Sequence, residues 1–208
     1  MAEPSDNATV FVIDDDPTLR RSIEFLAESV GLQVASFGSA QEFLDGADAT
    51  VPGSIVLDVR MPGMSGLDLL DELTDRGFHH PVIVITGHAD VPMAVRALKA
   101  GAIEFIEKPF NDQDLLDRVQ KAIEWDAEQR SRSSDVLVVR ERIATLTPRE
   151  REVMDLVIDG NANKQIAATL GLSEKTIEVH RSRVMRKMQA SNAADLIRMV
   201  LEARAATG

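Results

Sequence analysis

The chain has 208 residues, a formal net charge of -11 and no cysteine. This length allows one large domain or two modest ones, and the missing cysteines exclude structural disulfides, zinc-thiolate sites and cysteine nucleophiles. The polar, acidic start at Met1–Asp6, together with the lack of any run of ~20 apolar residues, predicts a cytoplasmic protein without a secretory signal or a membrane partner.

Residues 9–129 alternate short β-rich apolar runs with amphipathic segments of helical length. This pattern is typical of parallel strands joined by crossover helices, so we predict an α/β fold, a doubly wound five-stranded parallel sheet. The expected strands are Thr9–Ile13, Gln33–Ser36, Ser54–Leu57, Val82–Ile85 and Ile103–Ile106, and the expected helices lie near residues 17–30, 39–46, 66–76, 90–100 and 112–129.

The periodicity weakens between residues 126 and 142, where the polar segment Gln129–Ser134 indicates a linker that could extend the last helix. The apolar patch Val136–Val139 fits a strand by composition, but its isolation leaves a helical or packed segment at least equally open. We therefore predict a first domain at 1–125, a linker at 126–142 and a second domain at 143–208.

Charge supports this division. Residues 1–125 carry 22 Asp and Glu against 9 Lys and Arg, whereas residues 141–208 carry 9 acidic and 11 basic residues. A compact basic stripe lies within residues 173–188, where five basic residues outnumber two acidic ones. Two domains of different electrostatic character are expected, and the second has the balance suited to an anionic partner.

The second domain is predicted to be small, all-α and of helix-turn-helix type. Thr147-Pro148-Arg149-Glu150 supplies an N-cap, a proline at the first helical position and a glutamate three residues after the cap, so a helix should begin there and end near Gly160. Three more helices are expected at Asn163–Leu170, from the Ser173 cap to about Met188, and at Asn192–Ala205.

Reactive side chains follow four of the five predicted strands. Because the carboxyl ends of parallel strands meet at one edge of a sheet, these side chains should converge. They are Asp14 and Asp15 after the first strand, Asp58 after the third, Thr86 after the fourth, where Gly87 follows it, and Lys108 after the fifth.

Clustered carboxylates repel one another unless a hard cation neutralises them, so we expect Mg²⁺ as the cofactor. Asp14, Asp15 and Asp58 would hold it, together with the backbone carbonyl of Arg60 in the turn that follows. A shielded carboxylate can attack phosphorus, and Asp58 is our candidate nucleophile. The remaining groups serve the phosphoryl group: Lys108 and the Thr86 hydroxyl would bind its oxygens, and Gly87 would leave room for its entry.

These residues resemble a known family. Val12–Asp15, Leu57–Gly66, Ile85–His88 and Glu107–Phe110 look like the receiver domain of two-component response regulators, over residues 9–125, and Ile85–Val95 with Phe105–Phe110 is similar to the FixJ subfamily. The resemblance implies a flavodoxin-like fold, phosphotransfer from a sensor histidine kinase to Asp58, and no enzymatic activity beyond its own phosphotransfer and dephosphorylation. It also implies that Thr86 and Phe105 act as a switch pair that creates a dimerisation surface.

The third helix of the second domain is our candidate for DNA recognition. On a 3.6-residue period Lys175, Glu178, Val179 and Ser182 share one face, which we assign to the major groove. Thr176 and His180 could approach DNA or pack within the domain. The predicted contacts are completed by cations for the phosphates, namely Lys164, Arg181, Arg183, Arg186 and Lys187.

Residues 143–204 resemble the LuxR-type DNA-binding domain. The motifs that carry this resemblance are Leu146–Val153, Asn163–Ala167 and Ser173–His180. It implies promoter DNA as a partner and a homodimer formed through the fourth helix on DNA, and it leaves RNA polymerase open as a further partner.

Two alternatives remain at this stage. Phe11–Thr18 fits the D-x-D-x-T loop of haloacid-dehalogenase-type phosphatases, in which Asp14 would be the nucleophile, although this leaves Asp58 unexplained. The other alternative keeps the first domain and makes the second a protein-binding module. Two experiments distinguish these alternatives from the regulator. Phosphate found on Asp58 rather than Asp14 would exclude the phosphatase, and a steep salt dependence of duplex binding would exclude the protein-binding module.

Overall fold

The computed structural model describes residues 8–88 and 90–206, so the acidic start at Met1–Asp6 lies outside the described residues. The chain divides into two compact units after residue 129. Within the described ranges, no helical segment combines the length and the apolar character needed to span a lipid bilayer.

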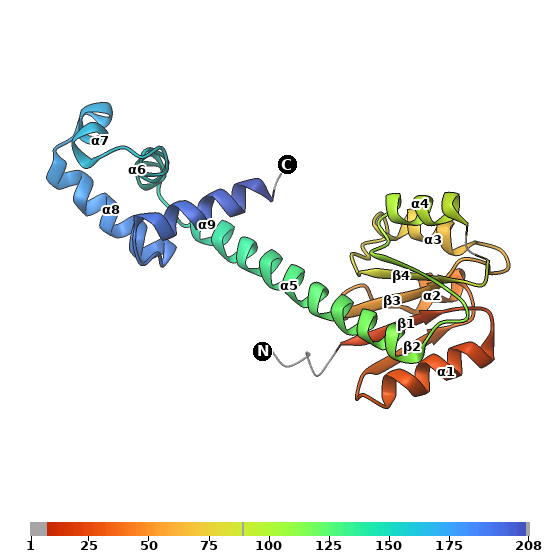
Figure 1. The fold of residues 1–208 in the computed structure, drawn as a ribbon. Coiled ribbons are helices and arrows are strands. Elements are labelled where there is room, and N and C mark those ends of the chain that lie inside the picture. Colours follow the sequence, from red (N-terminus) through yellow and green to blue (C-terminus); the bar gives the residue numbers. More distant parts are fainter. Residues whose placement is uncertain (1–7, 89, 207–208) are drawn as a thin grey trace. The chain divides into compact units, whose positions relative to one another are not determined.

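The first unit is built on a five-stranded parallel sheet with the strand order β2-β1-β3-β4-β5 (Figure 1). The doubly wound fold is confirmed, and the strand ends differ from the prediction by one residue at most. The order reverses between β1 and β3, which opens a crevice at their carboxyl ends. The strands are β1 (Thr9–Ile13), β2 (Gln33–Phe37), β3 (Gly53–Asp58), β4 (Val82–Thr86) and β5 (Glu104–Glu107).

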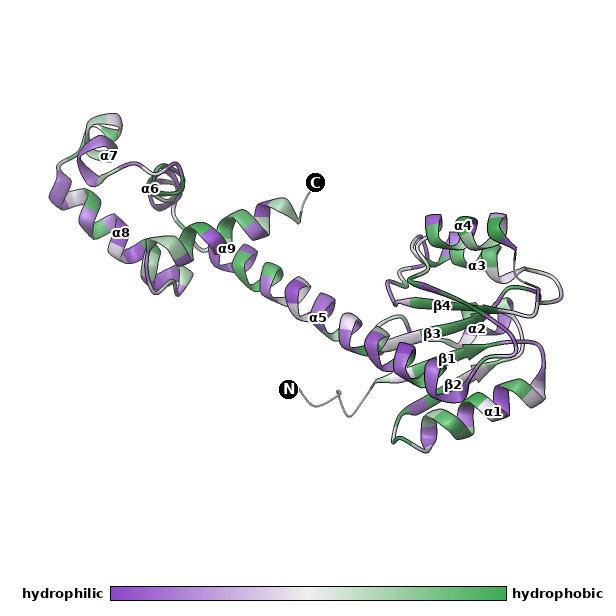
Figure 2. Ribbon diagram, in the orientation of Figure 1, coloured by the Kyte–Doolittle hydropathy of each residue, from purple (hydrophilic) through white to green (hydrophobic). Residues whose placement is uncertain are grey.

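Helices cover both faces of the sheet because successive strand residues point to opposite sides. Phe11, Ile55 and Leu57 pack with α2 (Ala40–Gly46), α3 (Gly66–Leu73) and α4 (Val91–Lys99). Their neighbours in the sequence, such as Val10, Val12 and Val56, pack with α1 (Pro17–Glu28) and the first half of α5 (Asp112–Ala144). Strands buried on both faces must be apolar throughout, and Figure 2 shows β3 and β4 as hydrophobic.

Two glycines fix the ends of β3. Gly53 has φ +154°, and a Cβ there would lie 1.8 Å from the carbonyl oxygen of Thr9. Its amide donates a 2.9 Å hydrogen bond to Oδ2 of the buried Asp126 on α5. At the other end, a Cβ on Gly66 would lie 1.9 Å from the backbone oxygen of Asp58. Only glycine allows these close approaches of backbone to backbone.

Helix α5 is longer than predicted. We expected it to end near residue 129, but it continues to Ala144, so the segment 126–142 is helical and the apolar patch Val136–Val139 belongs to the helix. Both predicted domain borders therefore fall inside α5. The cause is tertiary: Val139 is buried in the core of the second unit, while the preceding serines are exposed and carry no apolar periodicity.

The second unit is helical, as predicted. Its helices are α6 (Pro148–Ile158), α7 (Asn163–Leu170), α8 (Glu174–Met188) and α9 (Ala193–Ala205). Thr147 and Glu150 form the predicted capping box of α6, and Ser173 caps α8. The buried core includes Ile166, Ile177, Val184, Met188, Leu196 and Val200, so Ile177, Val184 and Met188 form the inward face of α8.

Candidate functional site

The carboxyl ends of β1, β3 and β5 bring two acids and one base together. Lys108 Nζ lies 2.7 Å from Asp14 Oδ2 and 2.6 Å from Asp58 Oδ1. Asp14 is 1% exposed and Asp58 is 4% exposed, so the two carboxylates share one ammonium in a largely dry pocket. Two acids thus share a single basic side chain.

Burial and the shared ammonium shift the pKa values of these groups. Burial raises the pKa of the Asp58 carboxyl above its ordinary value, although its hydrogen bond and Coulomb attraction to Lys108 act in the opposite direction. Burial alone would lower the pKa of Lys108, but its hydrogen bonds to Asp14 and Asp58 outweigh burial and raise it. Lys108 is thus held in its charged form.

The other predicted pocket residues surround this group. Arg60 donates its backbone N–H to Asp58 Oδ2 at 2.8 Å, and the Asp15 side chain is exposed. Thr86 is fully buried, and its Oγ1 accepts a 3.3 Å hydrogen bond from the backbone N–H of His88. A Cβ on Gly87 would meet nothing within 4 Å, which leaves the space beside Thr86 open.

Phe105, the predicted aromatic member of the switch pair, is partly buried. It packs against the hydrophobic cluster that joins the sheet to α2, α3 and α4. Its backbone pairs with Val84 of β4, two residues before Thr86. The two predicted switch residues therefore belong to the neighbouring strands β4 and β5.

The donor chemistry of the pocket fits a hard divalent cation. Asp14 and Asp58 offer buried carboxylate oxygens with more negative charge than Lys108 neutralises. In the described part of the chain, however, no three His, Cys, Asp or Glu side chains are grouped closely enough to hold a metal. Asp15, which is exposed, would have to turn inward to complete the predicted set.

Some features of the pocket were not predicted from the sequence. Arg20 donates to the backbone oxygen of Asp14 at 2.5 Å, and the Lys108–Pro109 peptide bond is cis. Asp16 caps α1 by accepting from the backbone amides of Thr18 and Leu19. The Asp16-Pro17 pair is a recognisable helix start, so this role could have been predicted, whereas no sequence signal marks the contact of Arg20.

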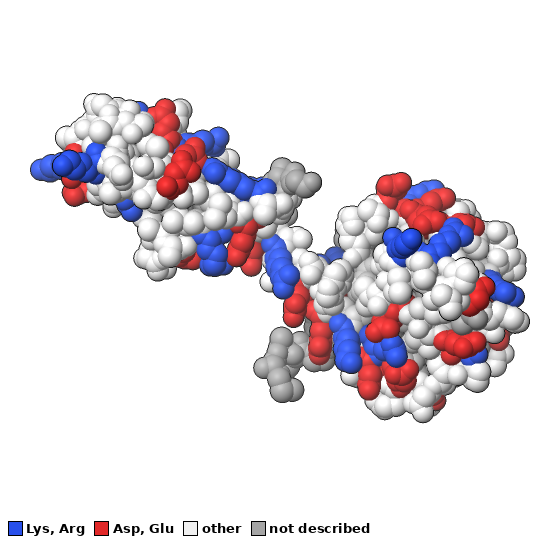
Figure 3. All heavy atoms as spheres, turned by 45° about the horizontal axis from the view of Figure 1, so that its top comes forward, with Lys and Arg blue, Asp and Glu red and all other residues white. Residues whose placement is uncertain are grey.

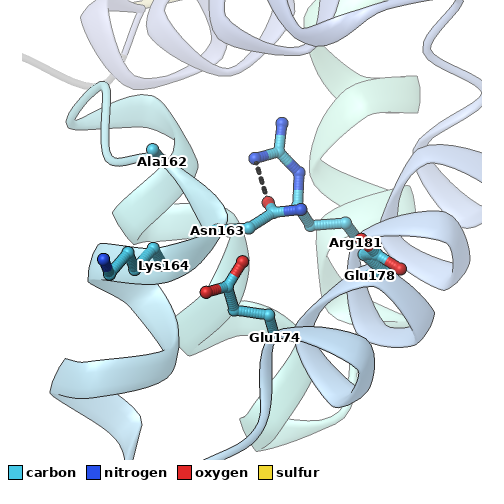
Figure 4. A pocket seen from close by; sticks show the side chains of 6 residues that line it. All are labelled: Ala162, Asn163, Lys164, Glu174, Glu178 and Arg181. Carbon is cyan, nitrogen blue, oxygen red and sulfur yellow. Dashed lines mark hydrogen bonds between the residues drawn. The ribbon is translucent and has the colours of Figure 1, made fainter.

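The second unit contains an open hollow of about 660 Å³ between α7 and α8 (Figure 4). Arg181 of α8 donates a 2.7 Å hydrogen bond to Asn163 Oδ1 and so connects the two helices. The lining residues are Ala162, Asn163, Lys164, Glu174, Glu178 and Arg181.

The face of α8 that we assigned to the DNA groove is free of core contacts. Lys175, Glu178, Val179 and Ser182 are all exposed. Thr176 is half-buried, and its hydroxyl contacts that of the Ser173 cap at 2.8 Å. His180 is also half-buried, and its Nδ1 has no hydrogen-bond partner in the described part of the chain.

The predicted phosphate-binding cations fall into two groups, of which the first, Arg181 and Lys187, is bonded within the unit. Lys187 lies 2.6 Å from Glu150 Oε2 and 3.0 Å from the Thr145 carbonyl oxygen, and the Lys187 hydrogen bond lowers the pKa of Glu150 to about 2. Lys187 therefore has partners within the unit, and its contact with a DNA phosphate stays a prediction. The second group, Lys164, Arg183 and Arg186, has no side-chain hydrogen bond or ion pair within residues 8–88 and 90–206, and the same holds for Lys175 of the groove face.

Basic residues do not form a uniform surface on the second unit. On the face seen in Figure 3, acidic side chains are interspersed among the basic ones. Because of this mixture, only particular helices of the second unit can attract a polyanion. These are α7 and α8, whose lysine and arginine side chains include several without a bonded partner in the described residues.

Comparison with known proteins assigns both units. Residues 10–120 match the family described as response regulator receiver domain. Residues 144–200 match the bacterial regulatory proteins of the luxR family.

Similar proteins are alike over nearly the whole chain. Nodulation protein W of Bradyrhizobium diazoefficiens is 51% identical over 95% of this chain and 87% of its own length. The transcriptional regulatory protein FixJ of Azorhizobium caulinodans is 50% identical over 92% of this chain and 91% of its own.

Two solved structures are similar over the same extent. The response regulator StyR has a TM-score of 0.81 at 42% identity, covering 94% of this chain and 99% of that structure. Full-length FixJ from B. japonicum has a TM-score of 0.58 at 41% identity, covering 95% of this chain and 97% of that structure.

Proposed function

This chain belongs to the two-component response regulators that join a receiver domain to a luxR-type DNA-binding domain, and we propose that phosphorylation of Asp58 controls its binding to promoter DNA. It is a transcriptional regulator, and the matches of its two units to the receiver and luxR families support this function over the phosphatase and protein-binding alternatives. The observation that carries the proposal is the convergence of Asp14, Asp58 and Lys108 at the β1/β3 crevice.

In the proposed reaction an Asp58 carboxylate oxygen forms a bond to phosphorus while the bond from phosphorus to a histidine nitrogen of the sensor kinase breaks. Lys108 is already within hydrogen-bond distance of Asp58, so its ammonium needs only a small movement to bind the arriving phosphoryl oxygens. The Thr86 hydroxyl binds another of these oxygens. A Cβ on Gly87 would meet nothing within 4 Å, so the space through which the phosphoryl group enters is open.

Receiver domains in general bind Mg²⁺, and we propose that Asp14, Asp15, Asp58 and the Arg60 carbonyl hold this ion here. When bound, it neutralises the negative charge of the acids and of the phosphoryl group. The two buried carboxylates with their single ammonium support this assignment.

We further propose that Thr86 and Phe105 pass the phosphorylation event to the surface of the receiver, which then dimerises. In the second unit, α9 would dimerise on DNA. The partners are a sensor histidine kinase, double-stranded promoter DNA and a second copy of the chain, with RNA polymerase as a further candidate. A DNA-binding role supports action in the cytoplasm.

For DNA contact we propose α8 as the helix that enters the major groove. The free exposed face of this helix would read bases through Lys175, Glu178, Val179 and Ser182, with Thr176 beside it. The phosphate contacts would come from Lys164, Arg181, Arg183, Arg186 and Lys187, of which Arg181 also donates to Asn163 and Lys187 to Glu150.

Peptide mapping after incubation with Mg²⁺ and acetyl phosphate tests the proposal. We expect phosphate on the Asp58 peptide, its loss in Asp58→Asn, and its retention in Asp75→Asn, which changes an exposed acid of the same unit. Promoter binding should strengthen with phosphodonor in the native chain and in the control only. Phosphate on Asp14, or undiminished labelling of Asp58→Asn, would contradict the assignment.

A further inference from the structure

We propose that Glu178 determines operator specificity by accepting a hydrogen bond from the exocyclic amine of a cytosine in the major groove. This inference rests on the proposed function, because it requires α8 to enter the groove. It concerns which base is read, which neither the fold nor the family assignment specifies.

The first observation is the lack of any partner for this acid. Among residues 8–88 and 90–206, no side chain forms a hydrogen bond or ion pair with the Glu178 carboxylate. Arg181, one turn further along α8, donates instead to Asn163. Lys187 is held by Glu150. Glu178 therefore presents a carboxylate without a bonded partner on an exposed face.

The second observation is its position. Glu178 is the fifth residue of α8, and it lines the hollow between α7 and α8 (Figure 4). The N-terminal part of a recognition helix is the part that contacts base edges. Glu174 also lines the hollow, but it is the first residue of the helix. An acid at that position stabilises the helix through its interaction with the helix dipole. No such reason applies to Glu178.

Charge then restricts the groups that this carboxylate can contact. Beside phosphates it is repelled, so it weakens sequence-independent binding. A carboxylate only accepts hydrogen bonds, and the major-groove donors are the amines of cytosine and adenine. On adenine the amine lies next to the N7 acceptor, which repels the second carboxylate oxygen. Cytosine has no acceptor in that position, so it is the base that suits Glu178.

Its neighbour Val179 is consistent with base contact. This apolar side chain is 46% exposed on the same face of α8. Val179 does not belong to the hydrophobic core of its unit, and an apolar group can pack against a thymine methyl in the groove. Glu178 and Val179 thus form a pair of adjacent side chains with no role in the core of their own unit.

Selection of binding sites from a randomised duplex library tests the inference. The full-length chain, treated with phosphodonor, would be compared with Glu178→Gln, Glu178→Ala and the control Glu174→Gln. We expect the native chain to select cytosine at one position of each half-site. The Gln variant should select adenine there, because an amide pairs with both N6 and N7, and the Ala variant should lose preference at that position alone.

Affinity measurements on single operators make the test quantitative. Replacing the selected cytosine should weaken binding of the native chain about 5- to 150-fold, the range of one specific base contact, and should leave the affinity of Glu178→Ala unchanged. Unrelated duplex should bind the Ala variant more tightly than the native chain.

Two results would overturn the inference, and they differ from each other. If the native chain selects a motif and both Glu178 variants select the same motif, the inference fails while the proposed function stands. If the native chain binds no duplex in a salt-dependent manner, the proposed function fails and this inference with it.

Discussion

At the scale of single residues, Lys108 is the group on which the charge of the receiver pocket depends. It contacts both Asp14 and Asp58, and no second ammonium or guanidinium is bonded to either carboxylate in the described residues. The three side chains therefore act as one electrostatic unit, and the loss of the base affects both acids at once.

We expect Lys108→Met to lower the free energy of unfolding of the receiver by up to about 3–5 kcal/mol, since it leaves two buried carboxylates without a partner. The lower part of that range applies because the Lys108 side chain is 21% exposed to water. Urea unfolding followed by the fluorescence of the single tryptophan, Trp125 on α5, measures the change.

The loss of unfolding free energy in Lys108→Met should depend on pH. Removing the ammonium raises the pKa of Asp58 beyond the rise that burial causes. A raised pKa destabilises the folded state where the carboxyl is charged, so the deficit of the variant should shrink as the pH falls. Lys121→Met, which removes an exposed lysine of α5, should show no deficit at any pH.

Gly66 offers a second test at this scale. In Gly66→Ala the new Cβ would lie 1.9 Å from the backbone oxygen of Asp58, so α3 or the phosphoacceptor strand must move. We expect a loss of about 1–3 kcal/mol in stability and slower labelling by acetyl phosphate. Gly46→Ala, whose Cβ would make only a 3.4 Å contact with the Phe37 ring, should label at the native rate.

At the scale of elements, Glu150 and Lys187 join the start of α6 to the end of α8. Glu150 is buried, completes the capping box of α6 and accepts from Lys187 at 2.6 Å. The orientation of the proposed recognition helix therefore depends on an ion pair at its far end, away from Glu178.

This ion pair predicts the behaviour of the second unit in acid. The pKa of Glu150 is lowered from 4.5 to about 2, so its stabilising effect is complete above pH 4.5 and is lost as the pH falls towards 2. Glu150→Gln should destabilise the unit at pH 7 and become equal to the native chain near pH 2. Urea titrations followed by NMR amide signals of α6 and α8 would measure this.

A matched control lies on the same helix. Glu152 pairs with Arg149 at 2.6 Å, but its side chain is 51% exposed. An exposed pair contributes about 0–1 kcal/mol, so Glu152→Gln should change the stability of the unit little at any of these pH values. Equal losses of stability in Glu150→Gln and Glu152→Gln would contradict the larger stabilising effect expected of the buried pair.

Most elements could be predicted because their signals are local. The apolar runs at Thr9–Ile13 and Val82–Ile85 are too short for helices and are bounded by turn residues. The Thr147 capping box and the Ser173 cap likewise determine helix starts within four residues. The convergence of Asp14, Asp58 and Lys108 followed from parallel strand topology, which these local signals imply.

The failures concern long-range contacts. The continuation of α5 depends on Val139 reaching the core of the second unit, and no local pattern in the serine-rich segment before it signals a helix. The ion pair of Lys187 with Glu150 was not predicted either, because the two residues are 37 positions apart along the chain. Periodicity within one element cannot identify such partners.

At the scale of the whole molecule, α5 belongs to both units. Its first part packs in the receiver core through Leu115 and Val119, and its last part packs in the second core through Val139. Between them Ser133 and Ser134 are exposed. A change confined to this middle part should spare both cores.

We expect Ser133→Pro to break the helix there, since proline removes one hydrogen bond and clashes with the preceding turn, at a local cost of about 3 kcal/mol. Labelling of Asp58 and basal duplex binding should persist, whereas the gain in binding on phosphorylation should fall. Ser133→Ala is the control. If the proline variant retains the full gain, α5 does not need to be continuous for regulation.

The hydrogen bond between Gly53 and Asp126 connects α5 directly to β3, the strand that ends at Asp58. The two residues are 73 positions apart, yet the 2.9 Å contact brings α5 within one six-residue strand of Asp58. Position 53 also tolerates no side chain, because a Cβ there would overlap the Thr9 carbonyl. Glycine is therefore the one amino acid that fits where β3 is tied to α5.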